Sequence, residues 1–259
     1  MTKTARKKEH PEEKQGADVL ERGDIYFLYR PAVEVEHPAG LEDVERFFMV
    51  LKPKNAGLYR LIVIGEKRLP DLQSHERYWG FVEAVEKSGK AIEERLSGAV
   101  YETQTRGTRH LPAARPAGEG KYVLAFAARS LHLLFVLDLP EKPAEVQKAF
   151  HLPREAAMVM AVKNPEASSP PGVGLPKEEK ADYPRELIDV FRHRRFAGED
   201  VRLLDYAGAE FILVGEQADL EDFGTTLLHK QSDHSRLLKD LQMDQSEHPA
   251  APLFKGEWA

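Results

Sequence analysis

Basic and hydroxyl side chains gather between Tyr101 and Lys121, and this segment is the strongest candidate for a ligand site. It holds three arginines and one lysine against two acidic residues, together with three glycines. Guanidinium groups offer planar, bidentate donors to phosphate or carboxylate, and glycines let backbone N–H groups approach an anion closely. We therefore expect an anionic, phosphate- or nucleic-acid-like ligand to contact Thr103, Thr105, Arg106, Arg109, His110, Arg115 and Lys121.

The alternative for this segment is structural: its arginines would pair with surface carboxylates and clamp two parts of the chain together. A second basic cluster, Arg192, Arg194 and Arg195, follows a short helix predicted at 183–191. It too has two interpretations, contact with phosphate or contact with the carbonyl groups at the end of that helix. If both clusters shared one face, a chain of net charge −6 would still present one positive groove.

Several catalytic and cofactor-binding classes are excluded by residues or spacings that the sequence lacks. It has no cysteine, which excludes disulfides, thiolate metal sites and a cysteine nucleophile. It has no P-loop, His-Glu-x-x-His or Gly-x-Ser-x-Gly string. His229 and His234 are five residues apart, a spacing that does not place both on one helix face. We therefore expect no metal site and no cofactor.

Asp205, Tyr206 and Glu210 combine carboxylates and a phenol beside a predicted strand, a set that suits acid–base chemistry. The alternative is a turn, in which Asp205 and Gly208 form the bend that leads into the strand. Since the sequence shows no nucleophile–base pair, we favour a protein without catalytic activity.

A β-rich scaffold must position these candidate residues. Segments rich in aromatic and β-branched residues, each bounded by turn-forming or charged residues, predict strands. The predicted strands are 24–30, 47–51, 61–64, 122–127, 131–139, 156–162 and 211–214. Apolar residues at helical spacing predict helices at 78–96, 183–191 and 236–241. The segment 111–120 is rich in Pro, Ala and Gly, which predicts a loop that joins two halves.

The order of these elements is similar in the two halves of the chain. Leu61–Asp71 resembles Met158–Glu166, and a helix candidate follows each, which suggests an internal duplication. We predict an α+β fold of two similar β-rich halves with antiparallel sheets and flanking helices. The predicted divisions are a disordered charged tail at 1–17, a first half at 18–112, a second half at 113–218, and a C-terminal helix with a docking tail at 219–259.

The C-terminal residues Leu253, Phe254 and Trp258 would be costly to leave in water. We expect them either to cover a groove of their own chain or to anchor a second copy or a protein partner. The apolar runs are far shorter than the roughly 20 residues that a membrane-spanning helix needs. The basic N-terminal segment is not followed by the apolar stretch of a secretory signal. We therefore expect a soluble cytoplasmic protein.

Several strings of the sequence resemble those of a family of uncharacterised conserved proteins of bacteria and fungi. They are Arg22–Phe27, Tyr101–Gly107, Ala114–Gly120, Leu204–Glu210 and Ser246–Pro249. Some fungal members carry the label "BTB domain transcription factor", but a BTB domain needs a succession of helices, and strand patterns dominate here. The resemblance implies a recurrent fold and supplies no activity, cofactor or catalytic residue.

Two functions from different classes follow from these observations. The first is a binding or interaction protein that recognises an anionic ligand through the basic segment between its halves. The second is an enzyme that acts on an anionic small molecule at the same cleft. We favour binding, because recognition needs only the donors that the sequence supplies.

Overall fold

The computed structural model describes residues 17–105, 107–169, 174–218, 220–223 and 234–259. Arg106 and almost all of the predicted charged tail lie outside the described residues. The described chain is mostly β structure, with 40% of its residues in strands and 19% in helices. The prediction of antiparallel sheet with flanking helices is confirmed, although the helices are few and short.

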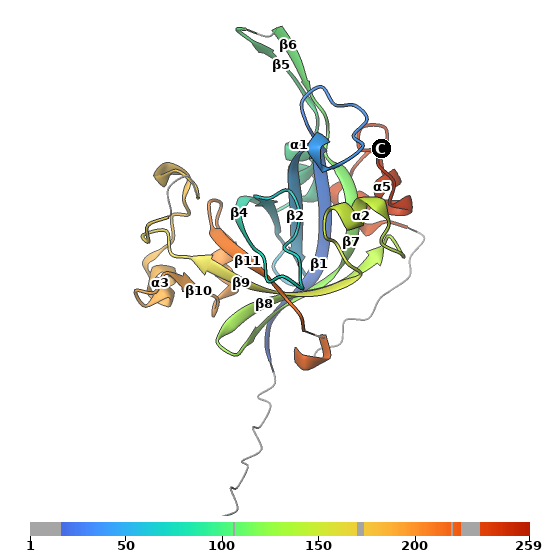
Figure 1. Cartoon of the computed structure of the whole chain (residues 1–259). Coiled ribbons are helices and arrows are strands. Elements are labelled where there is room, and N and C mark those ends of the chain that lie inside the picture. Colours follow the sequence, from blue (N-terminus) through green and yellow to red (C-terminus); the bar gives the residue numbers. More distant parts are fainter. Residues whose placement is uncertain (1–16, 106, 170–173, 219, 224–233) are drawn as a thin grey trace, which may run out of the picture.

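Eight antiparallel strands close into a barrel (Figure 1). They are β1 (Asp18–Pro31), β2 (Val44–Pro53), β3 (Tyr59–Ile64), β4 (Arg77–Glu86), β7 (Arg115–Ala127), β8 (Ser130–Leu139), β9 (Glu155–Lys163) and β11 (Glu210–Glu216). Around the barrel the order is β1-β2-β3-β4-β11-β9-β8-β7, and β7 pairs with β1 to close it. Both halves of the chain therefore contribute strands to the same barrel.

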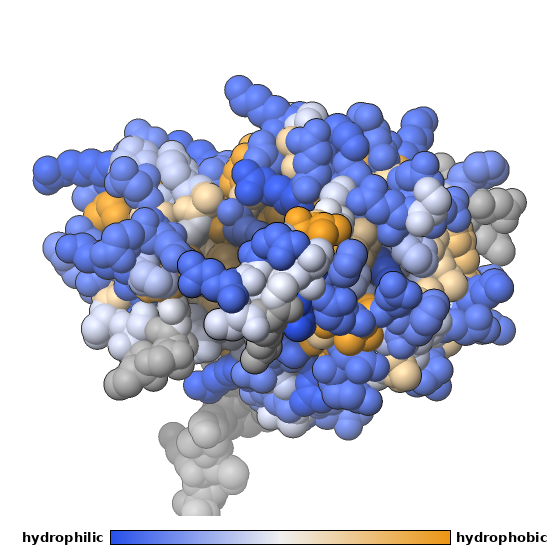
Figure 2. Space-filling view, turned by 90° about the horizontal axis from the view of Figure 1, so that it is seen from above, coloured by the Kyte–Doolittle hydropathy of each residue, from blue (hydrophilic) through white to orange (hydrophobic). Residues whose placement is uncertain are grey.

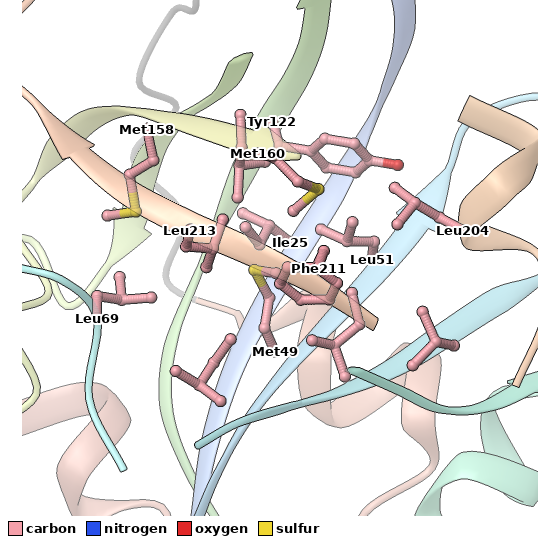
Figure 3. Close-up of a cluster of buried hydrophobic side chains, with 14 of the residues drawn as sticks. Ile25, Met49, Leu51, Leu69, Tyr122, Met158, Met160, Leu204, Phe211 and Leu213 are labelled. Atoms are coloured by element: carbon pink, nitrogen blue, oxygen red, sulfur yellow. The ribbon is translucent and has the colours of Figure 1, made fainter. Parts of the chain in front are cut away.

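The interior of the barrel is filled by apolar side chains (Figure 3). Alternate residues of each strand point inward, and an eight-stranded barrel is just wide enough for side chains to fill it. The inward set includes Ile25, Phe27, Phe47, Met49, Leu51, Ile62, Leu133, Phe135, Met158, Met160, Phe211 and Leu213. Aromatic rings pack closely within it, with Phe27 and Phe47 stacked at 6.0 Å between ring centroids. The barrel is a packed core rather than an open channel.

Each end of the barrel is covered. At one end, which we call the Arg115 end, Phe150 follows α2 (Glu145–Ala149) and stacks on Phe47 at 4.6 Å. The helix α5 (Ala251–Lys255) also packs on β7 near this end. At the opposite end, which we call the Lys163 end, α3 (Arg185–Ile188) contributes Leu187 to the core. Figure 2 shows a surface that is largely hydrophilic, with small and separate hydrophobic patches.

Two helices cover the outer face of the barrel beside β1, β2 and β3. They are α1 (Gly89–Leu96) and α4 (Arg236–Leu241), whose Ile92, Leu96, Leu237 and Leu241 are completely buried. Buried Glu119 of β7 holds the start of α4, because its carboxylate accepts the Leu237 N–H at 2.9 Å. The predicted helix at 236–241 is confirmed.

The remaining short elements connect these parts. They are η1 (Leu41–Asp43), β5 (Ala99–Thr103), β6 (Gly107–Leu111), η2 (Lys177–Glu179), η3 (Asp189–Phe191), β10 (Phe196–Ala197), η4 (Val201–Leu204) and η5 (Leu220–Phe223). Strands β5 and β6 form a separate two-stranded ribbon that projects from the barrel (Figure 1). No helix of the described residues is long and apolar enough to cross a membrane.

The predicted helix at 78–96 is wrong over its first half. Residues 77–86 form β4, and the helix begins only at Gly89, where Ser88 accepts the Ala91 N–H as an N-cap. The apolar spacing there fits a helix, but pairing with β3 on one side and β11 on the other outweighs that local preference. Buried Gly80, Val82 and Ala84 show the period of two that identifies the strand.

The predicted loop at 111–120 is also wrong, because most of it is the first part of β7. Its glycines serve strand packing rather than a turn or a ligand. A Cβ atom on Gly120 would lie 2.0 Å from the Val136 carbonyl oxygen of the neighbouring strand β8. A side chain therefore cannot be accommodated at this position while the two strands stay paired.

Candidate anion-binding site

The predicted basic segment does not form one cradle, because its residues are divided between the β5–β6 ribbon and β7. On the ribbon, Arg109 lies 3.3 Å from a carboxylate oxygen of Glu34, and the His110 N–H donates to the same carboxylate at 2.8 Å. Thr103 donates to the Gly107 carbonyl at 3.0 Å, and Thr105 lies in the turn. These contacts match the structural alternative, in which the segment clamps parts of the chain together.

The surroundings of His110 are acidic rather than basic. A pocket of about 360 Å³ at the base of the ribbon is lined by His110 and by the three glutamates Glu34, Glu36 and Glu247. Three carboxylates disfavour a bound anion there. Lys121, farther along β7, forms an ion pair with Asp24 and contributes no free charge.

The second basic cluster lies at the Lys163 end, where β10 pairs with the last residues of β9. Arg194 forms an ion pair with Glu199 and donates to the Phe191 carbonyl oxygen at 3.1 Å, so the helix-end interpretation describes it. Arg195 donates to the Ser168 carbonyl oxygen at 3.0 Å, and Arg192 is exposed at a positive φ of 47°. The two basic clusters lie at opposite ends of the barrel and do not share a groove.

Arg115 is the predicted residue whose surroundings differ from all of these. It is the first residue of β7, it is only 5% exposed, and the register places it opposite Tyr29 of β1. One terminal nitrogen, Nη2, donates to the Glu36 carbonyl oxygen at 2.5 Å. Its other nitrogens, Nε and Nη1, are buried without a hydrogen-bond partner among the described residues. No carboxylate of the described chain forms an ion pair with it in the structure.

Tyr29 adds a third unsatisfied donor beside the two nitrogens of Arg115. Its side chain is completely buried, and its O–H finds no acceptor among the described residues. Burial raises the pKa of the Tyr29 phenol to about 12, although the nearby Arg115 charge and the Ala259 backbone lower it. The phenol therefore keeps its proton at neutral pH and is able to donate it in a hydrogen bond.

Aromatic rings form the rest of this site. Tyr29 contacts Phe150 at 5.2 Å and Trp258 at 5.4 Å between ring centroids. Trp258 is half-buried, so the side chain packed on Tyr29 is itself in contact with solvent. We call the group of Arg115, Tyr29, Phe150, Trp258 and the Glu36 carbonyl the Arg115 site.

The C-terminal residues that were expected to dock do so on their own chain. Leu253 is completely buried and Trp258 packs on Tyr29, whereas Phe254 is 41% exposed. Of the three residues named as a possible anchor for a partner or a second copy, Phe254 is therefore the most exposed. A role in binding another chain stays a prediction.

A second buried arginine, Arg60 of β3, shows how this chain satisfies a charge that is structural. Its two terminal nitrogens donate to the Glu21 carboxylate at 2.6 and 2.8 Å, and its Nε donates to Asp205 at 2.7 Å. The Tyr122 hydroxyl donates to Glu21 at 2.7 Å. The sequence analysis did not predict this network. A single arginine in the otherwise apolar strand 59–64 could have indicated a buried ion pair.

The predicted acid–base candidates are also held by structural partners. Asp205 accepts from Arg60, and Tyr206 packs on Tyr183 at 5.2 Å between ring centroids. Glu210 lies 3.1 Å from the buried ammonium group of Lys163. The turn interpretation therefore describes these residues better than catalysis does.

The Arg115 site thus brings together buried donors of two residues that find no acceptor in the described chain. No protein-family model, curated protein or solved structure matches this sequence, so its geometry is the guide to function.

Proposed function

We propose that the protein binds a small anionic group, a carboxylate or a phosphate, at the Arg115 site. The observation that supports this most is the buried guanidinium of Arg115: among the described residues it has no counter-charge, and two of its nitrogens have no acceptor. A buried charge is costly unless it is paired, and the penalty is relieved when an anion supplies the missing acceptors. Arg60, the other buried arginine compared above, is paired with two carboxylates, and Arg115 differs from it in this respect.

The unsatisfied donors at this site come from two adjacent strands. Arg115 offers the N–H groups of Nε and Nη1, which point in different directions because Cδ lies between these two nitrogens, and Tyr29 offers its O–H. An oxygen atom of a carboxylate or phosphate can accept a hydrogen bond from either residue. Entry requires the side chains over Tyr29 to move, and half-buried Trp258 is the one in contact with solvent.

The experiment is calorimetric titration of the purified protein with inorganic phosphate and, separately, with acetate and citrate. We expect saturable binding of at least one of these anions, and loss of that binding in Arg115→Met. Arg109→Met is the matched control, because Arg109 belongs to the same predicted segment but is paired with Glu34. Binding that survives Arg115→Met and disappears in Arg109→Met would place the anion on the ribbon and contradict the proposal.

The internal duplication is a second, structural part of the proposal. Strands β1 to β4 form one four-stranded meander, and β7, β8, β9 and β11 form another. The first strands of the two meanders pair with each other, and so do the last strands, which is the arrangement that a two-fold axis produces. The similar segments 61–71 and 158–166 begin in β3 and β9, the third strand of each meander. A structural superposition of the two meanders in this register tests the idea.

A further inference from the structure

A fully buried histidine faces two carboxylates beside the outer face of the barrel. The Nδ1 atom of His248 lies 2.7 Å from the Ala114 carbonyl oxygen. A carbonyl only accepts, so Nδ1 must carry a proton. The other ring nitrogen, Nε2, lies 3.4 Å from Oε1 of Glu93, and it has no other partner in the described part of the chain. In a neutral imidazole this places a lone pair against a carboxylate oxygen.

Glu247 supplies a third donor atom. Single ligand atoms of Glu93, Glu247 and His248 all lie within 4.8 Å of one another. Glu93 comes from α1, whereas Glu247 and His248 come from the segment after α4, so the fold brings them together from distant parts of the sequence. Glu93 and His248 are nearly or completely buried, and exposed Glu247 lines the 360 Å³ pocket at the base of the ribbon.

The carboxylate of Glu93 is oriented before any ligand arrives, because Lys90 and Ser97 both donate hydrogen bonds to it. Lys90 pairs with Oε2, which leaves Oε1 directed toward His248 with the Ser97 hydroxyl at 3.0 Å. Outer hydrogen bonds of this kind, including the one from His248 Nδ1 to a backbone carbonyl, orient the ligands of metal sites in proteins.

We propose that Glu93, Glu247 and His248 bind a divalent metal ion, with zinc the best match to one imidazole nitrogen and two carboxylate oxygens. Zinc–nitrogen and zinc–oxygen bonds of about 2.0–2.2 Å in a tetrahedron separate neighbouring ligands by roughly 3.3–3.6 Å. The 3.4 Å between His248 Nε2 and Glu93 Oε1 falls in that range. Three protein ligands leave a fourth position for water, and Glu247 places that position beside the pocket.

This site was not visible in the sequence. The expectation of no metal site considered histidine pairs close in the chain, but Glu93 and His248 are 155 positions apart. The two proposals can fail separately, because no residue of the proposed metal site belongs to the Arg115 site. The acidic pocket that disfavours an anion is consistent with a bound cation.

The test is titration of the chelator-treated full chain with zinc, followed by calorimetry, and with cobalt, whose visible absorption reports tetrahedral ligands. The lack of cysteine removes thiolates as competing ligands. We expect one zinc per chain, with at least about tenfold weaker binding in His248→Gln and in Glu247→Gln. Glu247→Gln changes an exposed side chain, so it remains informative if the histidine variant does not fold.

His132→Gln is the matched control. His132 is also buried and lies 2.9 Å from one carboxylate, that of Glu216, but it belongs to no three-ligand group among the described residues. Zinc binding should be unchanged in this variant. Equal zinc affinity in the wild type and in Glu247→Gln and His248→Gln would overturn the proposal. So would a wild type without zinc binding.

Discussion

Replacing Arg115 by methionine should make the protein more stable. Methionine keeps a long apolar stem but removes the buried charge and its two unsatisfied nitrogens. Each unsatisfied donor costs about 1–3 kcal/mol, whereas the lost bond to the Glu36 carbonyl is worth about 1.5–3 kcal/mol. Glu36 is exposed, so water can satisfy its carbonyl. The relief of the two unsatisfied donors, less the lost hydrogen bond, leaves Arg115→Met more stable than the wild type by about 2 kcal/mol in the free energy of unfolding.

The assay is thermal and urea unfolding of both proteins without added anions. For a chain of this size about 2 kcal/mol corresponds to a rise in melting temperature of roughly 4–8 °C. Adding the bound anion should stabilise the wild type and leave Arg115→Met unchanged. A variant that is less stable than the wild type by more than about 1 kcal/mol would refute the reasoning, since it would show that the fold satisfies this guanidinium.

The other predictions concern the scaffold. Arg60→Met should lower stability by about 3–5 kcal/mol in urea unfolding, because it leaves the largely buried Glu21 carboxylate, 11% exposed, without its ion-pair partner; an unchanged stability would contradict this. Leu253→Ala should cost about 2–5 kcal/mol, whereas Phe254→Ala at a partly exposed site should cost less than about 1 kcal/mol; equal losses would argue against the docked tail. Hydrogen bonds lower the pKa of Asp71. The stability that its carboxylate contributes is therefore fully present above the ordinary pKa of 3.8, and it is lost as the pH falls through the lower pKa of the folded state. The melting temperature should therefore fall less steeply between pH 6 and about pH 2 in Asp71→Asn than in the wild type. An equally steep fall in both proteins would contradict this prediction.

Most barrel strands could be predicted from local composition, because their inward and outward faces are both buried. The predicted strands at 24–30, 47–51 and 131–139 all lie inside the observed ones. Strand β4 could not be recognised, since Phe81, Val82 and Val85 fit a helix equally well. Its identity depends on pairing with β11, which follows it by more than a hundred residues.

The site was predicted only in part, and for a physical reason. Arg115 was among the predicted residues, but as a member of a loop with Arg109 and Lys121. The difference lies in their partners. Glu34 pairs with Arg109 and Asp24 pairs with Lys121, whereas Arg115 donates only to the Glu36 carbonyl among the described residues. Which carboxylate reaches which cation depends on strand register and on folding of distant segments, and neither is encoded in local spacing.

The closure of the barrel has a consequence for how the chain is made. Strands β1 to β4 are synthesised first and form a four-stranded meander with two open edges. The strands that pair with these edges, β7 and β11, are synthesised later. The seam β1–β7 joins residues 86 to 108 positions apart and the seam β4–β11 joins residues 129 to 137 positions apart, so loop closure makes both slow to form. During that delay the later meander of a second chain can occupy the same edges. Exchange of meanders between copies would then preserve every interior contact while joining two molecules.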